Sequence, residues 1–136
     1  QLARLASRVE RRRALAERYT AALADLEALR LPRERSGARS AWHLYPVRLR
    51  PGAVRGGRAA LFAALRARGI GVQVHYVPVH LQPLYRERFG TRFGDCPVAE
   101  QAYLGLLSLP LHPWLAEAEQ DRILDALRAE LRKARR

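Results

Sequence analysis

The stretch from residue 70 to residue 80 carries the two side chains best suited to chemistry, His75 and His80. Its bulky and polar residues alternate, which is typical of a β-strand whose successive side chains point to opposite faces. This alternation places His75 and Gln73 on a polar face, and Tyr76 on the face that packs into a core. A neutral imidazole can hydrogen-bond a hydroxyl or a phosphate oxygen. From the residues alone, His75 is either a functional residue that faces a ligand or a buried histidine bonded to the backbone, and the second is the more common case.

Metal ligation and nucleophilic catalysis have weaker support. The four histidines show no spacing, among themselves or with a carboxylate, that is typical of a zinc site. Cys96 is the only cysteine, which excludes an intrachain disulfide and a cysteine-based metal site. It precedes Pro97 at a predicted helix start, where the helix dipole favours a thiolate, but we interpret it as an ordinary small residue. We expect no bound metal.

The composition describes a globular and strongly basic chain. Its 136 residues are 49% hydrophobic and include 25 Lys and Arg against 13 Asp and Glu, for a net charge of +12. This balance is compatible with a nucleic-acid-binding module, but a missing acidic partner domain would explain it as well. Only one of the basic residues is a lysine, Lys133, and arginine excess of this kind is typical of a GC-rich genome. The absence of a membrane-length apolar run, of a signal peptide and of cysteine pairs favours a cytoplasmic protein.

The spacing of apolar residues predicts alternating helices and strands. Helices are expected at 1–30, 59–68, 97–105 and 117–133, and strands at 41–50, 70–80 and 107–110. Residues 86–95 are expected to form a surface loop, and Gly69 to cap the second helix. We interpret the triple arginine 11–13 as a solvated helix face that also contacts a missing domain. The predicted fold is a small two-layer α/β sandwich with a three-stranded sheet and a long N-terminal helix.

Three segments carry a family resemblance: Ser40–Pro46 (SAWHLYP), Gly69–Pro83 (GIGVQVHYVPVHLQP) and Leu107–Leu111 (LSLPL). They resemble the C-terminal domain of the DegT/DnrJ/EryC1/StrS nucleotide-sugar aminotransferases, pyridoxal-phosphate enzymes of the aspartate-aminotransferase fold. The stretch Arg11–Tyr19 is similar to the family's interdomain helix. The HYVPVHLQP wording is most similar to the branch that makes UDP-4-amino-4,6-dideoxy-N-acetyl-β-L-altrosamine for pseudaminic acid.

The resemblance implies a domain division and an activity. Residues 1–35 would be the interdomain helix and linker, and residues 36–136 the small C-terminal domain. The intact enzyme would transfer an amino group from glutamate to a UDP-4-keto-6-deoxy sugar and would act as a homodimer. Its cofactor, pyridoxal 5′-phosphate, would be held mainly by a large domain that this sequence lacks. The alternatives are a basic nucleic-acid-binding module and a non-catalytic dimerisation module.

The resemblance also implies which residues take part. The family's Schiff-base lysine lies in the large domain, so this fragment alone would be inactive and would supply no catalytic and no cofactor-binding residue. Its part would be one wall of the substrate cleft. His75, Tyr76, His80 and Gln82 match the family's cleft segment and are expected to bind substrate. His80 and Gln82 would line the sugar-nucleotide entrance beyond Pro78.

Overall fold

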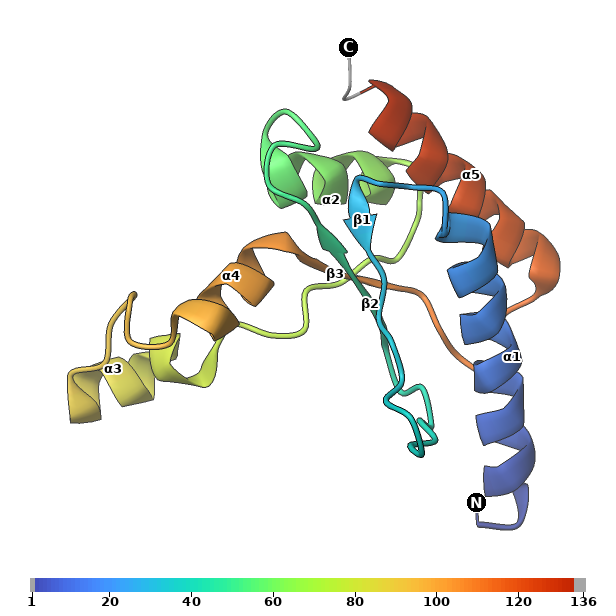
Figure 1. Ribbon diagram of the computed structural model, residues 1–136, viewed down its shortest axis with the longest axis horizontal. Helices are drawn as coiled ribbons and strands as arrows, with labels where there is room; N and C mark the ends of the chain where they lie inside the picture. The colour runs from blue at the N-terminus through green and yellow to red at the C-terminus, as the bar shows by residue number, and fades with distance from the viewer. Residues whose placement is uncertain (1, 134–136) are drawn as a thin grey trace.

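The computed structural model describes residues 2–133. Helices and strands alternate along these residues, and the chain runs from a long N-terminal helix to a long C-terminal one (Figure 1). In order, the elements are η1 (Leu2–Arg4), α1 (Leu5–Leu23), β1 (Leu29–Arg30), β2 (Tyr45–Leu49), α2 (Gly57–Ala67), η2 (Val79–Leu81), α3 (Pro83–Phe89), α4 (Pro97–Gly105), β3 (Leu106–Leu109) and α5 (Glu117–Lys133).

The sheet has three antiparallel strands in the order β1-β2-β3. Its central strand, β2, alternates between buried and half-buried residues, as a strand with one covered face should. Tyr45, Val47 and Leu49 point into the core, where Tyr45 lies opposite Leu109 of β3. The number of strands agrees with the sequence prediction, but β1 is a strand that the apolar pattern does not predict.

A single apolar core lies between the sheet and the helices α1, α2 and α5. Each helix contributes a stripe at three- and four-residue spacing, which places its side chains on one face. The largest fully buried apolar and aromatic side chains from these helices are Leu15, Tyr19, Leu23, Leu61, Leu65, Ile123 and Leu127. This arrangement confirms the predicted two-layer α/β sandwich. None of the helices within residues 2–133 has the length and apolar character needed to cross a bilayer.

The first helix joins the core only through its C-terminal half. Leu15 and Tyr19 are buried, whereas Leu2 and Leu5 are largely exposed at the other end of the same stripe. The helix ends at Leu23 rather than near residue 30, because the following residues turn and enter the sheet as β1. The described part of the chain therefore leaves the beginning of the stripe uncovered.

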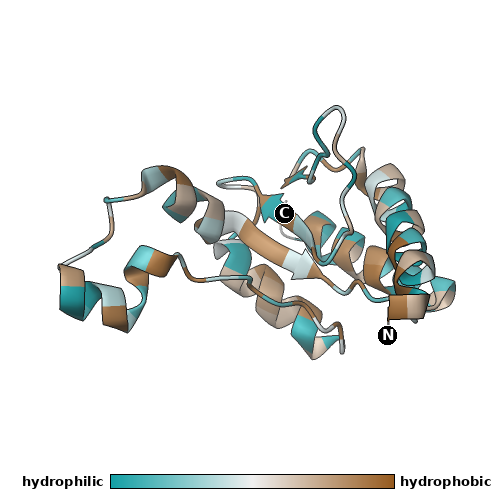
Figure 2. Ribbon diagram, turned by 90° about the horizontal axis from the view of Figure 1, so that it is seen from below, coloured by the Kyte–Doolittle hydropathy of each residue, from teal (hydrophilic) through white to brown (hydrophobic). Residues whose placement is uncertain are grey.

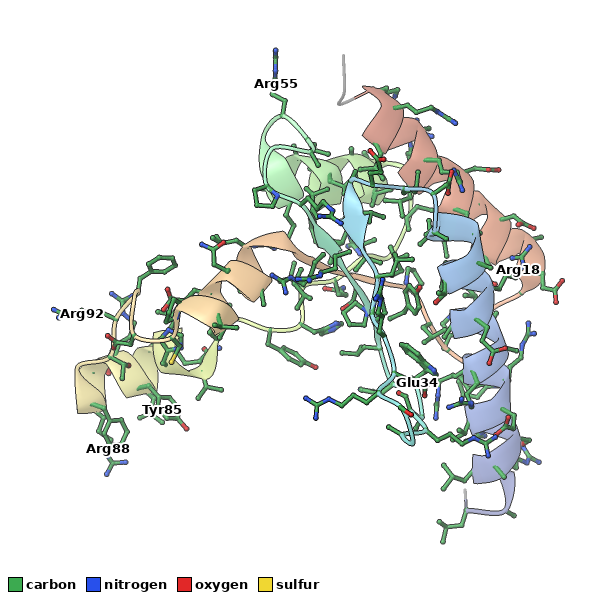
Figure 3. All side chains as sticks on the ribbon, viewed as in Figure 1. Arg18, Glu34, Arg55, Tyr85, Arg88 and Arg92 are labelled. Atoms are coloured by element: carbon green, nitrogen blue, oxygen red, sulfur yellow. The ribbon has the colours of Figure 1, made fainter. Side chains whose placement is uncertain are left out.

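The arginines of α1 bind this domain rather than solvent. Arg13 donates to a carboxylate oxygen of Glu34 at 3.1 Å, and Arg12 donates to the Ala41 carbonyl at 3.0 Å. Arg18 donates to the Asp121 carboxylate at 2.6 Å and so ties α1 to α5 (Figure 3). The interpretation of residues 11–13 as a solvated face was wrong, since Arg12 and Arg13 fasten the linker after β1 to the helix and Arg11 donates to the Leu115 carbonyl at 3.0 Å. Their contact with a missing domain stays a prediction.

One part of the molecule stands away from the core. The segment from η2 through α3 to the start of α4 forms an arm that projects from the sheet (Figure 1). Neither η2 nor α3 has a buried residue. Hydrophobic residues nevertheless occur along the arm (Figure 2), and Tyr85 on α3 points outward (Figure 3). The arm therefore needs something other than an apolar core to hold it in place.

Candidate functional site

The predicted histidine-bearing strand exists only as a single bridge to β3. The backbone N–H of Gln73 donates to the Ser108 carbonyl at 3.2 Å, and that of Ser108 donates to the Gln73 carbonyl at 2.8 Å. Beyond this bridge the chain leaves the sheet edge, and Pro78, which has no N–H, leads into η2. The prediction of a strand over residues 70–80 was therefore wrong.

Leaving the sheet also changes which side chains are buried. Val72, before the bridge, is fully buried as expected. Tyr76, after the bridge, is 69% exposed, so its predicted place in the core was wrong. The alternation of faces holds only while a strand stays paired with its neighbour. Tyr76 instead projects from the segment that joins the sheet to the arm.

His75 lies half-buried at the root of the arm. Its ring contacts the ring of Tyr76 edge-on, with 4.8 Å between the centroids. Its Nδ1 is buried and has no hydrogen-bond partner among residues 2–133. A buried polar atom without a partner is unusual in a folded protein and calls for an explanation. The alternative of a buried histidine bonded to the backbone finds no such bond at Nδ1.

His80 is held by a carboxylate that lies close by in space and twenty residues away in sequence. Its Nε2 lies 2.7 Å from Oε1 of Glu100, on α4. Glu100 is only 2% exposed, and its carboxylate also accepts the backbone N–H groups of Gly94, at 2.9 Å, and Cys96, at 3.1 Å. A buried carboxylate is tolerated when hydrogen bonds satisfy its oxygens. Glu100 therefore joins η2, the loop before α4 and α4 itself.

The electrostatics of this junction favour an ionised Glu100. Burial opposes the charge, but hydrogen bonds from His80 and from the N–H groups of Cys96 and Gly94 outweigh it and lower the pKa of Glu100 below its ordinary value of 4.5. Because a carboxylate can only accept hydrogen bonds, Nε2 of His80 is the donor in this pair. Its other ring nitrogen, Nδ1, takes no part in the junction and is not among the buried unpartnered atoms.

Two further hydrogen bonds close the segment around His80. The Thr91 hydroxyl donates to the His80 carbonyl at 2.6 Å, so the loop after α3 returns to η2. The side-chain amide of Gln82 donates to the Val77 carbonyl at 3.4 Å. The segment 75–82 thus contains all four residues predicted to bind substrate, and two of their side chains are already hydrogen-bonded, His80 to Glu100 and Gln82 to the Val77 carbonyl. Their role toward a substrate stays a prediction.

Sequence reasoning missed Glu100 and the extent of the short helix α3. A signal for Glu100 was available, because it lies in the first turn of a helix that begins with Pro97 after Cys96, where a carboxylate can accept free N–H groups. The residues up to 85 are expected to run into a short helical turn, but α3 carries no buried stripe and its residues 86–89 were interpreted as part of a surface loop. Cys96 is exposed at the start of α4.

The described residues do not fit a Schiff-base site for pyridoxal phosphate. The only lysine, Lys133, is exposed at the end of α5, where its ammonium lies 3.2 Å from the carboxylate of Glu130. A lysine that forms a Schiff base needs a deprotonated amine in a pocket. Across residues 2–133, no three His, Cys, Asp or Glu side chains gather where they could hold a metal ion. What this site offers is a wall of hydrogen-bonding groups.

Comparison with known proteins shows which family carries a domain of this fold. A sequence profile of the DegT/DnrJ/EryC1/StrS aminotransferase family matches residues 1–128. The aminotransferase TlmJ from Streptoalloteichus hindustanus is 34% identical, and its structure superposes with a TM-score of 0.87 over 100% of this chain and 35% of its own. The PLP-form of the putative sugar aminotransferase Spr1654 from Streptococcus pneumoniae is 28% identical, with a TM-score of 0.88 over 98% of this chain and 34% of its own.

Helicobacter pylori PseC, an aminotransferase of pseudaminic acid biosynthesis, is 25% identical, with a TM-score of 0.88 over 98% of this chain and 35% of its own. Its identity is lower than that of TlmJ, so the comparison does not single out the pseudaminic acid branch. The chain spans about a third of the length of the curated relatives it matches. With its profile match covering nearly the whole sequence, the chain belongs to the DegT/DnrJ/EryC1/StrS aminotransferase family.

Proposed function

We propose that this chain is the small C-terminal domain of a pyridoxal-phosphate-dependent nucleotide-sugar aminotransferase. The observation that carries the proposal is the superposition on TlmJ over the whole of this chain but only 35% of TlmJ. The exposed, ion-paired position of Lys133 supports it, because the Schiff-base lysine must then come from the remaining part of the enzyme. The fragment alone would be inactive.

The part that this chain plays is to form one wall of the substrate cleft. The wall is the segment 75–82. The chain leaves the sheet after Gln73, and His80 bonds this segment to Glu100 on α4. Its hydrogen-bonding groups can bind and orient a polar substrate. His75 is the strongest candidate for this contact, because its buried Nδ1 has no partner among the described residues.

We further propose the substrates, for which the support is weaker. The HYVPVHLQP wording favours a UDP-4-keto-6-deoxy sugar as the amino acceptor and glutamate as the donor, as in the pseudaminic acid branch. PseC, which belongs to that branch, shares 25% of its residues with this chain in the matched region. The intact enzyme would act as a homodimer and would hold pyridoxal phosphate mainly in its large domain.

The alternative of a nucleic-acid-binding module has less support in the structure than in the composition. Phosphate binding needs free guanidinium groups gathered on one face. In the described part of the chain, six of the 22 arginines are already paired with carboxylates. Those with an acidic partner are Arg11, Arg13, Arg18, Arg39, Arg68 and Arg128.

The proposal is tested by assaying the intact enzyme with glutamate and a set of UDP-4-keto sugars. His75→Ala should lower kcat/KM for the sugar nucleotide by about tenfold or more, the scale of losing one well-placed hydrogen bond to substrate. His43→Ala is the matched control, because His43 is exposed and makes no hydrogen bond in the described chain. An enzyme that aminates none of these sugars would refute the function, and an unchanged kcat/KM in His75→Ala would leave His75 a structural residue.

A further inference from the structure

The arm is the part of the fold whose position depends least on the core. Its helix α3 has no buried residue, and Phe89 and Phe93, near the arm's far end, are both mostly exposed. What fixes the arm at its root is the Glu100 carboxylate, which takes hydrogen bonds from His80, Gly94 and Cys96. A single buried side chain on α4 thus sets where η2 lies.

Glu100 does more than hold η2, because it also determines which nitrogen of His80 is available. The bond at 2.7 Å commits Nε2 as a donor to the carboxylate. A carboxylate bonded to one ring nitrogen fixes both the orientation of the imidazole and the position of its proton. Only Nδ1 then remains for a ligand. The Thr91 hydroxyl, bonded to the His80 carbonyl, keeps the backbone at this point from turning.

We propose that Glu100 is a positioning residue of the substrate cleft, which holds His80 so that its Nδ1 meets a hydroxyl or phosphate oxygen of the sugar nucleotide. The inference rests on the proposed function, since it assigns the nitrogen through which the cleft wall binds. It also separates the two histidines of the segment: His75 has its free Nδ1 at the sheet edge, and His80 presents its Nδ1 from the arm.

The substitution His80→Gln separates the roles of the two ring nitrogens. In His80→Gln, the side-chain amide can still donate to Glu100 from near the place of Nε2, but nothing replaces Nδ1. This variant should keep the thermal stability of the wild-type enzyme while KM for the sugar nucleotide rises about tenfold. A wild-type KM in His80→Gln would overturn the contact through Nδ1.

A double-mutant cycle tests whether Glu100 acts through His80. In the intact enzyme, Glu100→Leu, which removes the acceptor of the His80 Nε2 bond, should raise KM by about tenfold, whereas Glu87→Leu, the same change at an exposed position on α3, should not. In a His80→Ala background, Glu100→Leu should add nothing further to KM, because residues that act as a unit are not additive. Independent effects that multiply in the double variant would show that Glu100 has a merely structural role.

A readout independent of activity comes from nitrogen NMR of the histidine rings in the 136-residue chain. Wild type and Glu87→Leu should show His80 with a proton fixed on Nε2, and Glu100→Leu, which has no acceptor, should lose this signature. The absence of the signature in wild type, or its persistence in Glu100→Leu, would overturn the positioning role alone. A fixed Nε2 proton in an enzyme that aminates no sugar nucleotide would instead refute the proposed function, and the substrate contact with it.

Discussion

Gly105→Ala tests how closely the end of α4 must approach the sheet. Gly105 is the last residue of α4 and is buried against the central strand β2. A Cβ at this position would lie 2.5 Å from the carbonyl oxygen of Leu49, and 3.4 Å from its amide nitrogen. Real Cβ atoms do not approach a backbone oxygen this closely, so either α4 or β2 must move.

The packing around Gly105 sets how much stability the substitution should lose. The Leu49 carbonyl cannot retreat alone, because β2 is paired with β1 on one side and β3 on the other. Overpacking a well-packed site of this kind costs about 1–3 kcal/mol. Alanine recovers up to about 1 kcal/mol relative to glycine inside a helix, and less at a helix end. The free energy of unfolding should therefore fall by about 1–2 kcal/mol, which for a domain of this size lowers Tm by roughly 3–10 °C.

The assay is thermal unfolding of the 136-residue chain followed by circular dichroism. Gly71→Ala is the matched control, because its Cβ would meet nothing within 4 Å and its φ lies outside the left-handed range. That substitution should leave stability unchanged or raise it by about 0.4–1 kcal/mol, through the unfolded chain. If Gly105→Ala proves as stable as Gly71→Ala, then the end of α4 is not closely packed on β2 and the contact between Gly105 and Leu49 is wrong.

Two further predictions concern buried polar groups. Tyr19 is fully buried and its hydroxyl donates to the Pro110 carbonyl at 3.0 Å, so Tyr19→Phe should lower the free energy of unfolding by about 1–2 kcal/mol in urea titrations; an unchanged midpoint would contradict the assigned bond. Glu100 has a lowered pKa, and a carboxyl of this kind stabilises the fold above its ordinary value of 4.5 and loses that contribution as the pH falls. Urea midpoints measured from pH 7 down to pH 3.5 should therefore fall less steeply in Glu100→Gln than in wild type, and parallel curves would refute the linkage.

Elements with a strong local pattern were predictable from the sequence. The helix α5 has the predicted bounds, because its apolar stripe is regular and its acidic start and basic end suit the helix dipole. The helix α4 also has the predicted bounds, because Pro97 marks its first turn. Gly69 follows α2 with a φ of +75°, the left-handed conformation expected of a helix-ending glycine.

Elements that depend on distant partners were not predictable. The strand β1 is two residues long and exists because Leu29 lies opposite Leu49 of β2. The β-branched stretch around His75 has the composition of a strand but finds only one residue of β3, Ser108, with which to pair. Strand propensity describes a side chain's fit to a sheet surface, and it cannot say whether a partner edge is present.

The same reasoning explains why the candidate site was found only in part. Its histidines stand out by residue type, and the family resemblance names the segment that carries them. Glu100 does not stand out in the sequence, because its importance comes from its hydrogen bond to His80, twenty residues away. The helix between them, α3, has no buried residue. A cleft wall that lacks a core of its own has to be fixed by polar groups. If the segment forms a cleft wall as proposed, the buried carboxylate that bonds it is as informative about function as the histidines that the segment carries.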